Sequence, residues 1–159
     1  MAGIIETALI GSKVAILAST VGTDILIKTV TNTTSSIVSM TGYLMTSSQP
    51  GINEIVSTLK KIDLEFTVGI IEELVKEQEG KELEESVKKA MIGVNETLGL
   101  INQELDSMKQ AIEYHNTKYF NSWRSFSWTG NVNNIKDHNE ILKNRYMILF
   151  ELLKIKGYK

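Results

Sequence analysis

The two histidines are the side chains in this sequence best suited to acid–base catalysis. They are His115 and His138, and Asp137 directly precedes the second. Neighbouring residues on a helix do not face each other, so Asp137 is badly placed to orient His138. His115 falls on the apolar seam of a predicted helix, where a histidine satisfied within a core or an interface is the simpler interpretation. We therefore predict no catalytic residue and no enzymatic activity.

Acidic pairs are the other candidates for acid–base or metal chemistry. Glu72–Glu73 and Glu84–Glu85 stand about one helical turn before lysines such as Lys76 and Lys88, a spacing that predicts ion pairs on solvated helix faces. The sequence has no Glu-x-x-His motif for a helical di-metal site, no cysteine, no glycine-rich phosphate loop, no GxSxG and no HExxH. We predict neither a metal site nor a cofactor.

A cluster of aromatic residues is the best candidate for a binding function. The cluster comprises Tyr119, Phe120, Trp123, Phe126 and Trp128, with Arg124 among them. Tryptophan and arginine are typical of protein-interface hot spots, so we predict Trp123, Arg124, Phe126 and Trp128 as interface residues. Two alternatives stay open: the rings cover the end of the core, or they lie at a lipid headgroup boundary.

The distribution of charge divides the chain near Pro50. Only four of the 36 charged residues, Glu6, Lys13, Asp24 and Lys28, fall within residues 1–49. Such a segment must be buried against the rest of the chain, against other subunits or in an apolar phase. We predict one domain overall, in which residues 1–49 form a packing or assembly segment and residues 50–159 form a helical bundle.

The composition also bears on partners and location. The net charge is −2 and the sequence contains only two arginines, so we predict no nucleic-acid partner. Lys13 and Asp24 interrupt residues 8–27, and residues 29–48 are rich in hydroxyl groups, so neither stretch is a conventional membrane span. The first residues lack the basic start of a signal peptide. We expect an intracellular protein or one within an assembled particle.

Periodicity and the single proline predict long helices. Residues 3–30 have apolar side chains around most of a helix, which is typical of a helix buried on several sides, although short strands within 14–17 or 24–31 stay open. Small residues spaced along this helix permit close helix packing. We predict Gly11, Ala15 and Gly22 as interface residues for that reason.

Three further boundaries follow from capping and turn residues. The hydroxyl run at 31–36 predicts a break with an N-cap, followed by a short helix at 37–45. Ser48 as a cap and Pro50 in the first turn predict a helix from 51 to 78, which Gly80 terminates. The residues Thr129–Asn131 predict a turn before a final helix at 134–156.

The most regular pattern lies between these elements. Apolar residues recur in alternating steps of four and three at Val87, Met91, Val94, Leu98, Ile101, Leu105, Met108 and Ile112. This heptad pattern predicts a long helix at about 81–120 with a coiled-coil seam. We predict that Met91, Val94, Leu98, Ile101, Leu105 and Met108 form an interface. The fold class is all-α: an antiparallel helical bundle with this long heptad-patterned helix and a charge-poor N-terminal helical segment.

These patterns favour a non-enzymatic structural or assembly protein that acts through helix–helix association in a larger complex. Examples are a virion shell, a filament or a scaffold, and the richness in Ile, Lys and Asn fits a viral or bacterial source. The expected partner is protein, either further copies or other subunits. The alternative is a membrane-acting helical protein whose N-terminal hairpin inserts into or lies on a bilayer; membrane contact is possible but not favoured. Deleting residues 1–49 should leave a soluble bundle in the first case and abolish liposome binding in the second.

Overall fold

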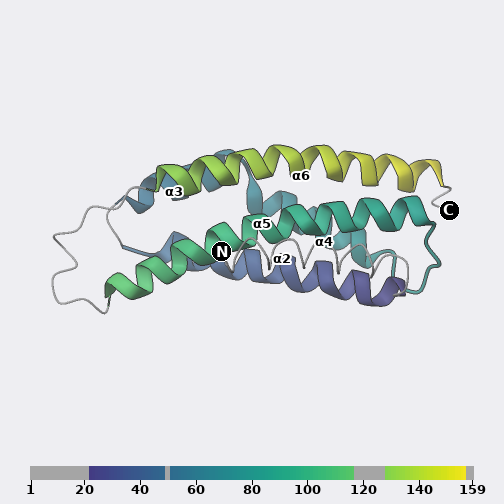
Figure 1. Cartoon of the computed structure of the whole chain (residues 1–159), viewed down its shortest axis with the longest axis horizontal. Coiled ribbons are helices and arrows are strands. Elements are labelled where there is room, and N and C mark those ends of the chain that lie inside the picture. The colour runs from purple at the N-terminus through teal and green to yellow at the C-terminus, as the bar shows by residue number, and fades with distance from the viewer. Residues whose placement is uncertain (1–21, 49–50, 117–127, 157–159) are drawn as a thin grey trace, which may run out of the picture.

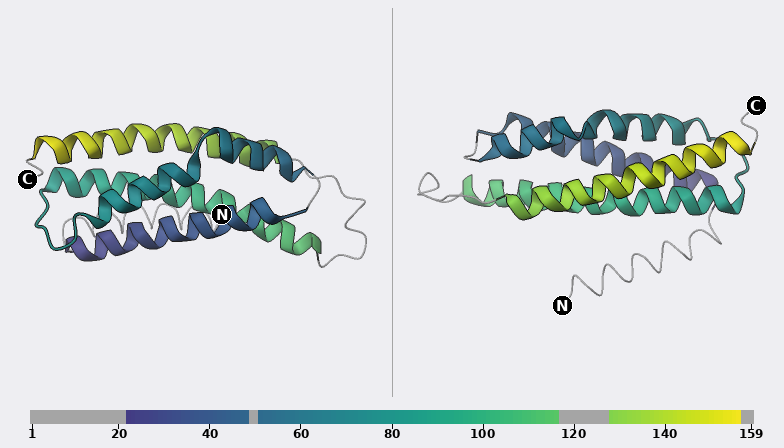
Figure 2. Two further views of the ribbon diagram at one scale, coloured as in Figure 1. Left: turned by 180° about the vertical axis from the view of Figure 1, so that it is seen from behind. Right: turned by 90° about the horizontal axis from the view of Figure 1, so that it is seen from above.

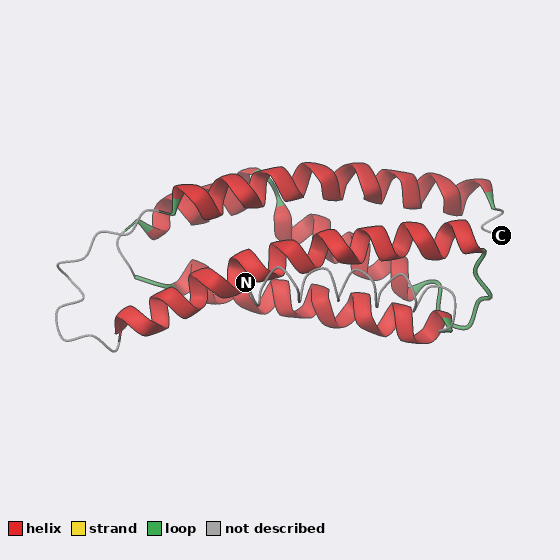
Figure 3. Ribbon diagram, in the orientation of Figure 1, coloured by secondary structure: helices red, strands yellow, loops and turns green. Residues whose placement is uncertain are grey.

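The computed structural model describes residues 22–48, 51–116 and 128–156 (Figure 1). Within these ranges the chain forms five helices and no strand: α2 (Thr23–Thr46), α3 (Ile52–Lys61), α4 (Leu64–Lys76), α5 (Glu85–Asn116) and α6 (Thr129–Ile155). Figure 3 shows the described turns and loops that join α3 to α4 and α4 to α5. The predicted all-α bundle is confirmed.

The bundle has four arms, the second of which consists of α3 and α4 together, and successive arms run in opposite directions (Figures 1 and 2). The antiparallel pairing of α5 with α6 is fixed by Arg145, which bonds to the Gly93 carbonyl, and by Asn131, which bonds to Glu104. By contrast, α2 lies parallel to α5. The Thr33 hydroxyl donates to Asn95 at 3.2 Å, and Lys109 lies 5.4 Å from the centre of the Tyr43 ring.

The heptad seam of α5 forms the centre of the core. None of its eight side chains from Val87 to Ile112 is more than 2% exposed. Buried side chains of α2, α4 and α6, such as Ile37, Ile71 and Leu149, complete the same contiguous apolar cluster. The prediction of a long helix with an apolar seam is confirmed, although the described helix begins at Glu85 rather than near residue 81.

The hydroxyl-rich stretch does not break α2, so the predicted break at 31–36 and the separate short helix at 37–45 are wrong. The helix continues because its threonine hydroxyls donate to carbonyls three or four residues earlier. Thr29 bonds to the Ile25 carbonyl at 2.8 Å, and Thr34 bonds to the Thr31 carbonyl at 2.9 Å. These bonds satisfy the hydroxyl groups within the helix instead of competing with it.

The predicted single helix at 51–78 is also wrong. Asp63 adopts a left-handed conformation, with φ 53° and ψ 43°, and separates α3 from α4. The residue that precedes α3 is Gly51 with φ 81°, not the predicted cap Ser48. Gly80 has φ 75° in the turn after α4, which agrees with its predicted role as a terminator.

The last helix begins earlier than predicted. Thr129–Asn131 forms the first turn of α6 instead of a separate turn, and the Val132 amide donates to the Trp128 carbonyl at 2.8 Å. Trp128 is 4% exposed, so its ring anchors this first turn in the core. Burial of a large aromatic side chain there outweighs the weak helix propensity of Gly130 and Asn131.

Candidate functional site

The predicted interface residues fall into three groups. Gly11, Ala15, Trp123, Arg124 and Phe126 lie outside the described residues. The second group consists of Gly22 and Trp128. Gly22 immediately precedes α2 in an extended conformation. Trp128, as described above, lies in the core.

The third group is the heptad seam. Met91, Val94, Leu98, Ile101, Leu105 and Met108 are all fully buried. They lie inside this chain's own bundle, in which α5 packs against α2 and α6. Contact with another chain through this seam would require the helices to exchange between chains, and such a contact stays a prediction.

The described side chains that could take part in acid–base or metal chemistry are scattered over the bundle. Tyr114 and His115 make an edge-to-face contact with ring centres 5.7 Å apart, near the end of α5. Glu72 accepts a hydrogen bond from Lys76 and raises the pKa of that lysine, a surface interaction between neighbouring turns of α4. Among the described residues, no group of three or more His, Cys, Asp or Glu side chains is arranged to hold a metal ion.

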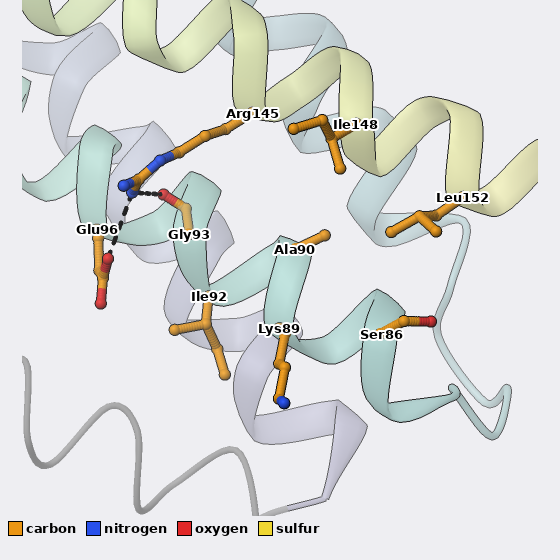
Figure 4. A pocket seen from close by; sticks show the side chains of 9 residues that line it. All are labelled: Ser86, Lys89, Ala90, Ile92, Gly93, Glu96, Arg145, Ile148 and Leu152. Atoms are coloured by element: carbon orange, nitrogen blue, oxygen red, sulfur yellow. Dashed lines mark hydrogen bonds and ion pairs between the residues drawn. The ribbon is translucent and has the colours of Figure 1, made fainter.

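Arg145 of α6 contacts three acceptors on a neighbouring helix. Its Nη1 atom donates to the Gly93 carbonyl at 2.7 Å and lies 3.3 Å from the Glu96 carboxylate (Figure 4). The same atom donates to the Thr97 hydroxyl at 3.1 Å. All three acceptors belong to α5. This guanidinium therefore fixes the register of α6 along α5.

Beside Arg145, a groove of about 500 Å³ lies between the two helices. Ala90 and Gly93 of α5 form part of one wall, and Ile148 and Leu152 of α6 form part of the other (Figure 4). Lys89, Glu96 and Arg145 also line the groove, so it combines apolar, small and charged residues.

Three isoleucines of α6 stay exposed, and one of them, Ile148, also lines the groove. Ile141, Ile148 and Ile155 follow one another at intervals of seven residues and are 44%, 58% and 75% exposed. We call these three residues the isoleucine stripe. The sequence showed that α6 has a wide apolar face, but sequence reasoning missed that one edge of it stays outside the core. The interval of seven is the signal that could have revealed it.

Two findings complete the description of the site. No helix within the described ranges is both long enough and apolar enough to span a bilayer.

No protein-family model matches this sequence, and searches of curated proteins and of solved structures found no match. The class of protein is therefore defined by its own geometry: an all-α bundle with an exposed isoleucine stripe.

Proposed function

We propose that this chain is a non-enzymatic structural or assembly protein that acts through helix–helix association within a larger complex, such as a virion shell, filament or scaffold. The observation that carries the proposal is the isoleucine stripe. Large exposed aliphatic side chains in one line along a helix are unfavourable in water and suit the packing of a second helix. A different face of α6 already packs in the core through residues such as Leu142 and Leu149.

The spacing around the stripe supports helix packing specifically. Ile141, Arg145, Ile148, Leu152 and Ile155 alternate steps of four and three, which is the same pattern as the internal seam of α5. The fourteen steps from Ile141 to Ile155 span about 21 Å of helix at about 1.5 Å per residue. This length offers a second helix several turns of continuous contact.

The magnitude of the contact indicates how it would be used. Complete burial of an isoleucine contributes about 1.5–3 kcal/mol, and these three side chains are already partly covered, so the stripe supplies on the order of 3 kcal/mol. Association costs about 4 kcal/mol or more in lost translational and rotational freedom. One stripe is therefore a weak pairwise contact, which suits an assembly in which many such contacts act together.

The test is the mass of the full chain in solution as a function of concentration, measured by sedimentation and light scattering. We expect the wild-type mass to rise with concentration, whereas Ile148→Lys stays monomeric because it places a charge at the centre of the stripe. Phe66→Lys is the matched control, since Phe66 is 64% exposed but lies on α4. A wild-type chain that stays monomeric, or an Ile148→Lys chain that still associates, would contradict the proposal.

The membrane-acting alternative requires a larger rearrangement. Its hairpin would include α2, whose side chains Val30, Ile37 and Leu44 are fully buried in the bundle. These side chains would have to leave the core before they met lipid, at a cost of several kcal/mol. Flotation of the full chain with liposomes tests this alternative, and binding that survives Ile148→Lys would favour it.

A further inference from the structure

The isoleucine stripe is symmetric along the axis of α6. Ile148 is its midpoint, with Ile141 seven residues before it and Ile155 seven residues after it. At about 1.5 Å per residue, the outer two lie about 10 Å on either side of the midpoint. Two copies that pack in opposite directions about Ile148 therefore bring isoleucine against isoleucine at all three levels. A parallel pairing would also match the isoleucines, so the direction must come from other residues.

A second row beside the stripe carries opposite charges at its two ends. Glu140, Met147 and Lys154 also follow at intervals of seven residues, and all three are exposed. When a two-fold axis relates two copies at Ile148, this row faces the same row of the other copy in the reverse direction. Glu140 of one copy is then within about 3 Å of the level of Lys154 of the other. A parallel pairing would instead place Arg145 level with its own counterpart, and like charges oppose association.

The groove between α5 and α6 offers room for a side chain of the second copy. The bond from Arg145 to the Gly93 carbonyl sets these two residues level, so Ala90 of the antiparallel α5 is level with Ile148. Leu152 lines the same groove and is half-buried in its own chain (Figure 4). In the two-fold pairing, Leu152 of the second copy lies on the groove side, within about 1.5 Å of the level of Gly93. Gly93 has no side chain to fill this place.

We propose that the isoleucine stripe binds a second copy of this chain, with the two α6 helices antiparallel about a two-fold axis at Ile148. Glu140 of each copy then lies beside Lys154 of the other. This inference rests on the proposed function and adds to it the identity and the direction of the partner. The pairing uses each stripe once, so it closes at a dimer, and the dimer is the unit that a larger complex would join through other surfaces.

Disulfide trapping with single cysteines tests the direction, because the chain has no native cysteine. In Ile148→Cys the two thiols meet at the two-fold axis, whereas in Ile155→Cys they are about 21 Å apart, too far for a disulfide. At a concentration where the wild-type mass exceeds that of a monomer, Ile148→Cys should form a disulfide-linked dimer several-fold faster than Ile155→Cys. The control is stringent because Ile155 is 75% exposed and Ile148 58%, so random collision would favour Ile155→Cys.

A charge exchange tests the contact between Glu140 and Lys154. Glu140→Lys and Lys154→Glu should each weaken the dimer several-fold by sedimentation, because each change brings like charges together, and the double variant should restore the wild-type affinity. Lys154 also lies 3.7 Å from Glu151 of its own chain, so the loss in Lys154→Glu alone has two possible sources. The restoration has one, because residues 140 and 154 of one helix are about 21 Å apart. Circular dichroism verifies that all three variants fold.

The outcomes separate this inference from the proposed function. Association of the wild-type chain with equal cross-linking of Ile148→Cys and Ile155→Cys would overturn the antiparallel pairing and leave the proposed function standing. A double variant that binds as weakly as the single variants would do the same. A wild-type chain that stays monomeric at every concentration would overturn both.

Discussion

The Arg145 guanidinium joins α6 to α5 through one nitrogen that serves three acceptors. Its shortest bond goes to the Gly93 carbonyl, a backbone group within a helix, while its contact with Glu96 joins two side chains that are 40% and 41% exposed. A charged hydrogen bond in a protein contributes about 1.5–3 kcal/mol, whereas an exposed ion pair contributes about 0–1 kcal/mol. The bonds to the Gly93 carbonyl and the Thr97 hydroxyl should therefore contribute more to the free energy of unfolding than the contact with Glu96 does.

Mutations at the two ends of this ion pair should have unequal effects. Arg145→Ala should lower the free energy of unfolding by about 2 kcal/mol, because it removes all three contacts and the packing of the aliphatic stem. Glu96→Gln should lower it by less than about 0.5 kcal/mol. Urea denaturation measures both, and the double variant gives the coupling. Equal losses for the two single variants would show that the ion pair, and not the carbonyl bond, holds the helices.

Glycine positions on and beside α5 offer a second prediction at the scale of single residues. A Cβ on Gly93 would stand 3.6 Å from Cδ of Arg145, an ordinary van der Waals distance. Gly93→Ala should therefore raise the free energy of unfolding by about 0.5–1 kcal/mol, because alanine favours the helix. Gly80→Ala should lower it by about 1 kcal/mol, since Gly80 has φ 75°. Thermal melting distinguishes the two, and a destabilising Gly93→Ala would mean that Arg145 cannot adjust.

At the scale of elements, Asp63 marks a division that no glycine or proline announces. Its left-handed conformation lets the chain turn between α3 and α4, and its side chain makes no capping hydrogen bond at the start of α4. Because an L side chain is strained in this region and glycine is not, Asp63→Gly should raise the free energy of unfolding by up to about 1 kcal/mol.

The control for Asp63 is a glycine in a regular helix. Gln103 is exposed in the middle of α5, so Gln103→Gly should lower the free energy of unfolding by about 1 kcal/mol. Chemical denaturation of both variants checks the contrast. If Asp63→Gly destabilises the protein as much as Gln103→Gly does, then the aspartate side chain contributes something at this turn beyond its backbone conformation.

The elements show how far sequence reasoning reaches. The α5 seam was predictable because the alternation of four and three is specific to a helix with one buried face, from Val87 to Ile112. The continuity of α2 was not predictable, because a run of threonine and serine can either cap a helix or bond back to carbonyls within it. In this protein the buried side chains of Thr34 and Ile37 favour a continuous helix. The division at Asp63 was hidden because tertiary packing, rather than local sequence, imposes it.

At the scale of the whole molecule, the charge-poor segment contributes to the one core of the bundle. Its second half is α2, which packs against α3, α4 and α5. Its buried apolar residues, Ile27, Val30, Ile37, Met40 and Leu44, belong to the same contiguous cluster as the α5 seam. Burial within the chain therefore accounts for the apolar residues of this segment, whereas the exposed isoleucine stripe lies at the other end of the sequence.

Two truncations separate these contributions. Burial of the five apolar side chains of α2 contributes on the order of 10 kcal/mol, at about 1.5–3 kcal/mol each, which is comparable to the entire stability of a typical domain. A chain that begins at Gly22 keeps α2 and should unfold cooperatively. A chain that begins at Gln49 should lose most of its helical signal and its cooperative transition, because the α5 seam would face water in place of α2. Circular dichroism during thermal unfolding measures both.

If the shorter chain melts cooperatively near the temperature of the longer one, then residues 50–159 form the bundle alone and α2 is an accessory to it. That outcome would return α2 to the role of an assembly segment, free to pack against a neighbouring subunit.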